Sequence, residues 1–357
     1  MANDIIIHAD CRHFMGHIPC KPHKDEGVHC DGCQYYDQVK ERILIIKLGA
    51  LGDVIRTTPI IEALKRQYPQ GQIFWLTESP EILPSSVDRA LPYELSSIVF
   101  LEQVEFDLLI NLDKDADACA LAARLSARTK LGFTLIGGVP APANEAARAK
   151  FLTGIFDDAS RANRLSYPEE LMAICGYRFN GQRYAIAPPS GDYIWRLPEG
   201  SGAVVGLNTG CGTRWTTRNW PDEHWAALAA ELLESGYRVL LLGGPDEHEK
   251  NVRLRLATGA WYEGTYALDQ FSDLVNQCQL VVTVVTMTLH LAIALGKKVV
   301  LFNNIFNASE FEMYGQGPIL EPPDCTCFYA HSCDKMCMAD LKVERVHKAI
   351  LEALPAA

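Results

Sequence analysis

Short apolar runs that end in glycine-rich or polar loops recur along this chain. The first covers residues 43–46, closes on Lys47, and continues into Gly49-Ala-Leu-Gly52-Asp53 and a helical pattern through residue 64. Such a run is typical of a strand buried on both faces, and glycines permit a tight turn after it. We therefore predict a strand, a glycine turn and a helix. The turn would lie at the carboxyl edge of a parallel sheet, where ligands bind in open α/β proteins.

The same pattern predicts further strands at residues 72–77, 106–111, 130–134, 204–208, 238–242, 280–284 and 298–302. Helical patterns lie between them at 116–125, from an opening at Trp220-Pro221-Asp222 to 233, and through 295. Strands that alternate with helices imply an α/β fold with parallel sheets and right-handed crossovers. The pattern lapses into proline and glycine between 180 and 202, which we interpret as a linker. Two similar halves would face each other across a cleft suited to a ligand of nucleotide size.

Length and charge narrow the class of protein. A chain of 357 residues is long enough for two domains, each with its own core. A formal net charge of -11 argues against a general nucleic-acid binder, although it leaves room for a local basic cleft for phosphates. No run of 18 apolar residues exists, so we expect a soluble, cytoplasmic protein without a signal peptide or a membrane span.

Eight of the twelve cysteines lie in two clusters, which favours metal binding over disulfides in a chain of this kind. Cys30 and Cys33 have the chelate spacing of a zinc or iron knuckle, and Cys11 and Cys20 would complete a four-thiolate set. His13, His17, His23 and His29 are further candidate ligands. The segment is too polar to fold around a core of its own, so a metal would supply its order. Reduced structural thiols are the alternative.

The second cluster has Cys325, Cys327, Cys333 and Cys337. It predicts a second structural metal site, for zinc or iron, with iron–sulfur as one form. Alternatively, the two clusters share one metal, provided that the terminal helix at 341–354 returns to the first domain.

Two loops carry candidate chemistry. In the second half, Thr209-Gly210-Cys-Gly212 is followed by Thr213, Arg214 and Arg218. Bare backbone amides and guanidinium groups both donate to phosphate oxygens, so this loop suits a diphosphate. In the first half, Asp53 is either a helix N-cap or a functional carboxylate. Neither loop has the pattern of a dinucleotide-binding or P-loop motif. The residues alone therefore indicate a two-domain nucleotide-binding protein.

Five motifs, in order across both halves, resemble glycosyltransferase family 9, the ADP-heptose:lipopolysaccharide heptosyltransferases. They are KLGALGDVIRTTP at 47–59, GLNTGC at 206–211, TTRNWPDEHW at 216–225, LLGGPDEHE at 241–249 and the segment 286–290 before AIALGKKVV. The likeness extends over residues 43–302. It implies a GT-B fold, in which two Rossmann-like domains bring donor and acceptor together, and an inverting sugar transfer without a catalytic metal.

The resemblance also implies roles for single residues. Asp53 matches the family's catalytic base, and Arg218 stands where the family commonly has a lysine on the donor diphosphate. Glu249, or else Glu247, matches the acidic residue on the adenosine ribose. The remaining donor-site candidates are Thr209, Thr213, Arg214, Thr286, Thr288 and His290, with glycine turns at Gly49, Gly52, Gly210 and Gly212.

The last motif departs from the family pattern. The usual Asp-Thr-Gly is Val285-Thr286-Met287 in this chain, which removes an acid and a flexible backbone position near the phosphates. The departure bears on the identity of the donor more than on the fold.

These patterns together predict four segments. They are a Cys/His metal-binding segment at 1–40, an acceptor domain at 41–190, a nucleotide-sugar domain at 203–322, and a cysteine-rich segment with the terminal helix at 323–357. Some family members, the autotransporter heptosyltransferases, carry an iron-binding cysteine finger in the position of the last segment.

We consider three functions. The first is transfer of a heptose or related sugar from an ADP-sugar to lipopolysaccharide core or another cell-envelope acceptor, with peripheral contact at the inner face of the inner membrane. The second is glycosylation of a protein acceptor, with the cysteine segment building an oligomer or docking the acceptor. The third is a non-catalytic, metal-dependent binding protein on a transferase scaffold.

Overall fold

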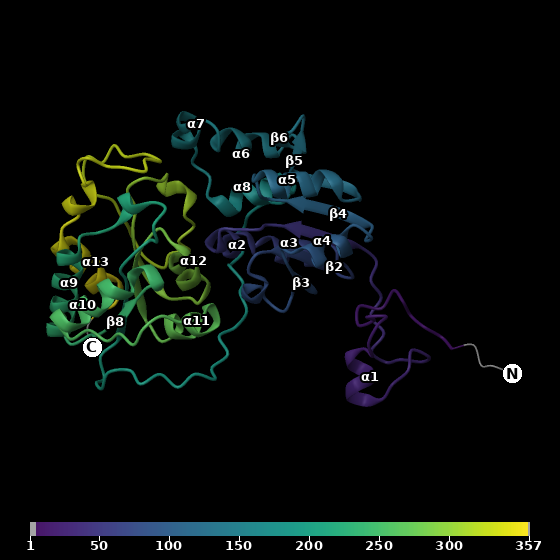
Figure 1. The fold of residues 1–357 in the computed structure, drawn as a ribbon, viewed down its shortest axis with the longest axis horizontal. Coiled ribbons are helices and arrows are strands. Elements are labelled where there is room, and N and C mark those ends of the chain that lie inside the picture. Colours follow the sequence, from purple (N-terminus) through teal and green to yellow (C-terminus); the bar gives the residue numbers. More distant parts are fainter. Residues whose placement is uncertain (1–4, 356–357) are drawn as a thin grey trace.

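The computed structural model describes residues 5–355 and has two α/β halves, each built on its own sheet (Figure 1). The predicted α/β class, with two sheets made mainly of parallel strands, is confirmed. No helix in the described part of the chain is long and apolar enough to cross a membrane.

The first sheet has the strand order β3-β2-β1-β4-β5-β6. All its neighbouring strands pair in parallel except β5 and β6, which are antiparallel. The strands are β1 (Arg42–Ile46), β2 (Gln72–Thr77), β3 (Arg89–Pro92), β4 (Phe106–Asn111), β5 (Ala127–Ile136) and β6 (Val139–Pro142). The helices of this half are α2 (Leu51–Thr57), α3 (Ile60–Gln67), α4 (Leu95–Leu101), α5 (Ala116–Arg124), α6 (Ala147–Thr153), α7 (Asp157–Ala162) and α8 (Tyr167–Ile174).

The second sheet is parallel throughout, with the order β11-β10-β9-β7-β8. Its strands are β7 (Val204–Asn208), β8 (Arg238–Leu242), β9 (Leu280–Val284), β10 (Lys298–Phe302) and β11 (Ile319–Leu320). The helices are α9 (Asp222–Glu234), α10 (His248–Thr258), α11 (Leu268–Asn276), α12 (Met287–Ala294) and α13 (Val343–Ala353). The central strands β7 and β9 are buried along their whole length, because helices cover both faces of a parallel sheet.

The segment after β1 differs from the prediction in two ways. Gly52 lies inside α2 and not in the turn before it, and Ala50 is the N-cap residue. The N-cap alternative for Asp53 is therefore wrong. The predicted single helix is also two helices, because Pro59 follows the end of α2 and cannot donate the hydrogen bond that would continue it.

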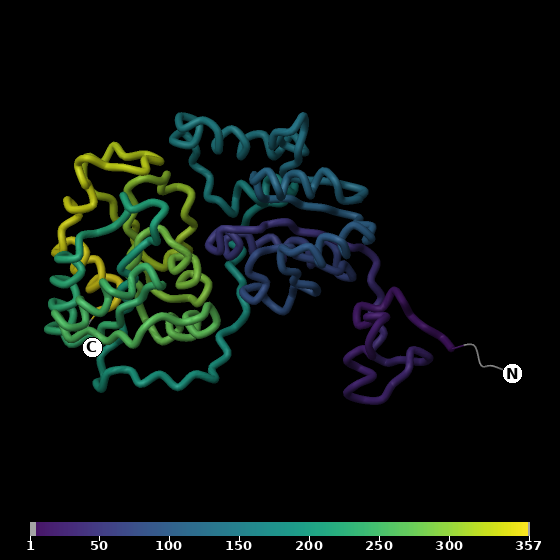
Figure 2. Tube along the Cα trace, viewed as in Figure 1, coloured from purple at the N-terminus to yellow at the C-terminus, as the bar shows by residue number. Residues whose placement is uncertain are grey.

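The linker and the two ends of the chain are seen best in Figure 2. Residues 175–203 connect the halves without a regular element, which agrees with the linker predicted there. The N-terminal segment, with α1 (Lys21–Glu26), projects from the far side of the first half. Arg12 attaches this segment to the first domain through an ion pair with Asp88 at 2.5 Å.

The terminal helix packs on the second half. Val346 and Ile350 of α13 are fully buried in a cluster with Trp220 and Trp225, and the Trp220 indole donates to the Leu341 carbonyl at 2.8 Å. The alternative in which this helix returns to the first domain, so that the two cysteine clusters share a metal, is therefore wrong. The clusters lie at opposite ends of the molecule (Figure 1).

Candidate active site

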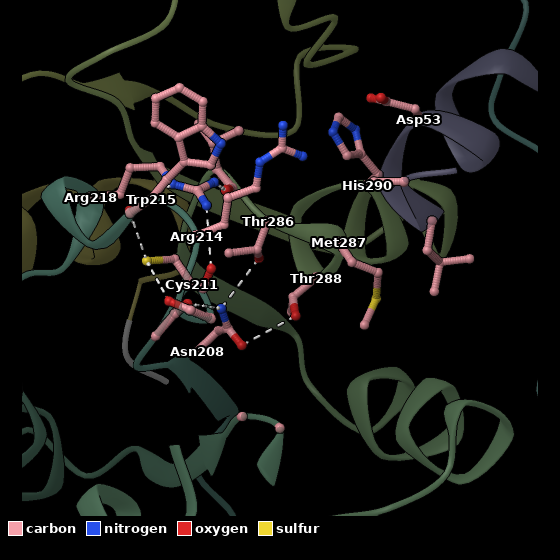
Figure 3. A pocket seen from close by; sticks show the side chains of 18 of the residues that line it. Asp53, Asn208, Cys211, Arg214, Trp215, Arg218, Thr286, Met287, Thr288 and His290 are labelled. Carbon is pink, nitrogen blue, oxygen red and sulfur yellow. Dashed lines mark hydrogen bonds between the residues drawn. The ribbon is translucent and has the colours of Figure 1, made fainter. Parts of the chain in front are cut away.

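A cleft of about 710 Å³ lies between the two halves. Its first wall is formed by the start of α2, and its second wall by loops after β7, β8 and β9 together with the start of α12. Figure 3 shows Asp53 and His290 on one side, and Arg214, Trp215 and Arg218 facing them. The carboxyl ends of strands from two sheets thus surround one space, as the two-domain interpretation predicts.

Asp53 lies in the first turn of α2, and its side chain is 34% exposed to the cleft. Its carboxylate pairs with Arg56 at 2.8 Å, one helical turn away. Burial by itself raises the pKa of Asp53, but the positive charges of Arg56 and Lys47 outweigh burial and hold this pKa below its ordinary value. Asp53 is therefore an anion throughout the physiological range, and it lines the cleft.

Sequence reasoning missed the charged groups behind Asp53. The Lys47 ammonium is buried at the end of β1, 3.1 Å from Asp113 and 3.9 Å from Asp53. Arg56 lies over the Tyr167 ring, with its guanidinium carbon 3.6 Å from the ring centroid. Asp113 follows β4, the neighbour of β1 in the sheet, so its position next to Lys47 depends on strand pairing and not on sequence distance.

The second wall carries the loop after β7, in which Arg218 belongs to a 3₁₀ turn at Thr216–Arg218. The Arg218 guanidinium donates to the carbonyls of Cys211, Trp215 and Val285. Burial lowers the pKa of Arg218 below its ordinary value, so an anion in the cleft would stabilise this cation. A guanidinium has five N–H donors, which leaves N–H groups for such an anion. Arg214 lines the same wall and is exposed.

Asn208, at the end of β7, links this wall to α12. Its amide group donates to Thr286 at 3.3 Å, and its carbonyl oxygen accepts from Thr288 at 3.2 Å. Thr286 is the N-cap residue of α12, so the positive end of this helix faces the cleft. Thr286 and Thr288 both line the cleft, and Thr288 is buried with its hydroxyl bonded to Asn208.

Three of the predicted donor-site residues do not line the cleft. Thr209 is buried behind the wall, where its hydroxyl donates to Asn251 at 2.6 Å, and Thr213 is exposed outside the cleft. Glu249 is exposed on α10, whereas Glu247 lines the cleft. The Glu247 carboxylate accepts from the amides of Gly212 at 3.1 Å and Gly244 at 2.9 Å, and so joins two loops of the second wall.

Two of the predicted glycines are needed for close approach. A methyl group at Gly52 would lie 2.8 Å from the His290 ring, and one at Gly210 would lie 2.2 Å from Glu247. Gly52 therefore lets α2 of the first half meet α12 of the second. Gly49 and Gly212 lie in the loops themselves, and Gly212 has a left-handed φ of 68°.

His290 is buried at this contact between the halves. Burial and the nearby Arg56 lower the pKa of His290 to about 3, against the opposite effect of Asp53. The imidazole is therefore neutral at physiological pH.

The C-terminal cysteines come together. The thiol sulfurs of Cys325, Cys327 and Cys337 lie within 4.8 Å of one another. Cys333 is 2.7 Å from Cys327 and 3.5 Å from Cys337, measured between sulfurs. Four converging thiols form the donor set that zinc or iron takes in tetrahedral sites, so these residues fit the predicted metal.

The N-terminal cysteines are arranged differently. Cys11, Cys20, Cys30 and Cys33 all line one cavity of about 290 Å³, together with His13, His23 and His29. Within residues 5–355, however, this set has no three ligand atoms within 4.8 Å of one another. His17 lies outside the cavity lining.

The two facing α/β halves form a GT-B fold, and comparison with solved structures confirms this fold class. An E. coli heptosyltransferase, WaaC, with ADP-2-deoxy-2-fluoro heptose aligns with a TM-score of 0.61 at 19% identity, over 87% of this chain and 99% of that chain. The iron-containing dodecameric glycosyltransferase TibC from enterotoxigenic E. coli H10407 aligns with a TM-score of 0.54 at 13% identity, over 88% of this chain and 76% of that chain.

Sequence comparison finds similarity to one family. Residues 205–313 match the model of glycosyltransferase family 9 (heptosyltransferase). Lipopolysaccharide heptosyltransferase 1 of E. coli K12 is 25% identical over 285 residues, which cover 72% of this chain and 85% of that protein. The resemblance to glycosyltransferase family 9 is therefore confirmed: this chain is similar to the lipopolysaccharide heptosyltransferases of that family.

Proposed function

We propose that this protein transfers a heptose, or a closely related sugar, from an ADP-sugar to lipopolysaccharide core or another cell-envelope acceptor, with inversion at the anomeric carbon. One observation carries the proposal. An anionic carboxylate on the first wall and an arginine-bearing glycine loop on the second face the same cleft. The similarity to lipopolysaccharide heptosyltransferases supports the choice of donor and acceptor.

In this proposal Asp53 takes the proton of the acceptor hydroxyl while that oxygen attacks the anomeric carbon. Inversion requires attack from the face opposite the leaving ADP, so base and diphosphate must lie on opposite sides of the sugar. The two walls of the cleft provide this separation. The pair with Arg56 fixes the direction of the carboxylate, and a positioned base of this kind contributes about 10²- to 10⁴-fold to the rate.

The second wall would bind the donor. Arg218 and Arg214 would meet the diphosphate, and the N-terminus of α12 would add its partial positive charge. We assign the ribose contact to Glu247 in place of Glu249, because only Glu247 lines the cleft. Each of its oxygens has a second lone pair for a ribose hydroxyl, besides the backbone amide that it accepts.

A donor screen tests this function. Purified protein should bind ADP-heptose more tightly than UDP- or GDP-sugars, and should release ADP only when a lipopolysaccharide-core acceptor is added. The product should have the inverted anomeric configuration by NMR. Retention of configuration, or a preference for another nucleotide, would contradict the proposal. Tight binding of ADP-heptose with no transfer to any acceptor would favour the non-catalytic alternative.

The four-thiol cluster favours a second candidate, the glycosylation of a protein acceptor within an oligomer. If this is correct, replacing Cys327 and Cys333 by serine should change the mass of the assembly in solution or abolish transfer to protein. A monomer whose mass and acceptor range are the same in both forms would exclude it. Peripheral attachment to the inner membrane stays a prediction.

We propose structural metals at both cysteine sets. The N-terminal segment needs one for a physical reason: none of its described residues, 5–41, is buried, so it has no apolar core to order it. His23 Nδ1 bonds to the Val28 carbonyl at 2.8 Å, an arrangement that orients Nε2 of a metal-bound histidine. Elemental analysis of the wild type and of variants with serine at Cys30 and Cys33, or at Cys327 and Cys333, should show a separate metal lost in each. A wild type free of zinc and iron would contradict both sites.

A further inference from the structure

The loop between the first and last C-terminal cysteines, residues 325–337, reaches the cleft. Its tip, residues 328–331, lies between the second and third cysteines of the cluster. Tyr329 of the tip lines the cleft, its amide donates to the Ile305 carbonyl at 2.9 Å, and its hydroxyl donates to Glu310 at 3.3 Å. Glu310 is buried and also lines the cleft. The cysteine loop thus contributes directly to the wall around the proposed donor.

The tip also contacts the loop after β7 that carries Arg214 and Arg218, which we call the arginine loop. The His331 ring stacks on Trp215 with centroids 3.8 Å apart and an interplanar angle of 10°. Thr217 donates to the Ala330 carbonyl at 3.1 Å. Thr217 directly precedes Arg218 in the 3₁₀ turn Thr216–Arg218, and Trp215 is the N-cap residue of that turn, so both contacts act on the segment that aims this guanidinium.

A third connection joins this segment to the thiols. The side-chain amide of Asn304 donates to the Thr217 carbonyl at 2.8 Å, and the backbone carbonyl of Asn304 accepts from the Cys325 thiol at 3.5 Å. The tip also contacts the first half, where the Arg161 guanidinium of α7 lies 4.4 Å from the centroid of the Phe328 ring. The tip therefore contacts both halves of the protein next to the cleft.

The cysteine loop does not hold this shape through burial. No residue from 323 to 336 is buried. Asp324, Tyr329 and Met336 have left-handed φ angles of 54°, 46° and 43°, a conformation that is unfavourable for most residues other than glycine. Bonds from the four thiolates to a metal are the interaction that would offset this strain.

We propose that the metal-bound cysteine loop is part of the donor site. Tyr329 contacts the donor, His331 positions the arginine loop through Trp215, and metal binding at the four cysteines sets the affinity for the donor. This inference rests on the proposed function for the identity of the donor. The coupling between metal and loop does not depend on that identity.

Two measurements test the proposal on the full-length protein. In the first, a chelator removes the metal while tryptophan fluorescence is recorded for the wild type and for Trp215→Phe. Loss of the His331 stack should change the emission of the wild type, and Trp215→Phe should lack that change. An equal change in both proteins would overturn the coupling.

In the second measurement, calorimetry gives the Kd for ADP. His331→Ala should raise this Kd about three- to tenfold, the range expected for loss of one aromatic stacking contact. Metal removal should raise it at least as much. Ser332→Ala is the matched control on the same loop, and its Kd should equal that of the wild type. An unchanged Kd in both His331→Ala and the metal-free protein would overturn the role in donor binding. If ADP fails to bind the wild type, the proposed donor is wrong, and the fluorescence measurement still decides the coupling.

Discussion

The two walls of the cleft are built from different kinds of interaction. On the first wall, side-chain ion pairs surround one carboxylate: Asp53 lies between Arg56 and Lys47, and Lys47 is shared with Asp113. On the second wall, backbone carbonyls hold Arg218, and the Glu247 carboxylate joins two glycine loops. The difference indicates separate tasks. The first wall controls the charge and direction of a base, and the second presents donors to an anion.

The largest effect should come from breaking the first wall at its buried cation. Lys47→Met leaves Asp113, buried at the end of β4, without its ammonium partner. Removing one member of a buried pair destabilises by about 3–5 kcal/mol, so the free energy of unfolding in urea should fall by that amount. Lys348→Met, on the exposed face of α13, is the control and should change little. A fully stable Lys47→Met protein would show that the pair does not support this wall.

The matching change on the second wall should affect binding. Arg218→Ala removes charge-assisted donors to the diphosphate, worth about 1.5–3 kcal/mol, so the Kd for ADP should rise roughly 10- to 100-fold. Arg218→Lys should fall in between, because an ammonium keeps the charge and loses the planar fork. Calorimetry measures each Kd, with Arg253→Ala on the exposed face of α10 as control. Equal affinities would remove Arg218 from the donor site.

The contact between the walls should make stability depend on pH. The pKa of His290 is lowered to about 3 in the folded protein, against about 6.5 for an exposed histidine, so below pH 6.5 only the unfolded chain takes up this proton. The free energy of unfolding should therefore fall by about 2 kcal/mol from pH 6.5 to pH 5. His290→Gln should abolish that part of the slope. The lowered pKa of Asp53 acts only at more acid pH, outside this window. A slope that is the same in both proteins would contradict the burial of a neutral imidazole.

The smallest effect is expected far from both walls. Serine at Cys30 and Cys33 should release the metal proposed for the N-terminal segment and leave the Kd for ADP within about twofold, because the segment projects from the far side of the first half (Figure 1). A large loss of ADP affinity would mean that this segment communicates with the cleft. The interpretation that the N-terminal cysteine set acts independently of the cleft would then be wrong.

The sequence predicted elements better than contacts between them. Apolar runs located the buried strands within one residue in most cases, since runs of β-branched and apolar residues bounded by glycine or polar residues are a local signal. The sequence pattern wrongly placed Gly52 in a turn, and it predicted one helix where the structure has two, α2 and α3. Helix boundaries depend on backbone geometry that composition specifies poorly.

Residues of the candidate site could be predicted from the sequence where they belong to a family motif. Asp53, Arg218 and His290 all lie around the cleft, as the family resemblance implied. Lys47 with Asp113, and Trp215 with His331, were not predicted as pairs, because each joins residues from distant segments that only the folded chain brings together. The same reason explains why Glu247 lines the cleft and Glu249 does not, since Glu247 belongs to a 3₁₀ turn at Pro245–Glu247.

The division of tasks between the walls is tested most directly by Asp53→Asn in single-turnover transfer from bound ADP-heptose. The variant keeps the size of the side chain and removes its capacity to take a proton. Asp53→Asn should lower the transfer rate by about 10²- to 10⁴-fold and leave the Kd for ADP unchanged. Glu62→Gln, on the exposed face of α3, is the control and should change neither quantity. Transfer at the wild-type rate in Asp53→Asn, or loss of ADP binding in place of the rate, would contradict this division of tasks.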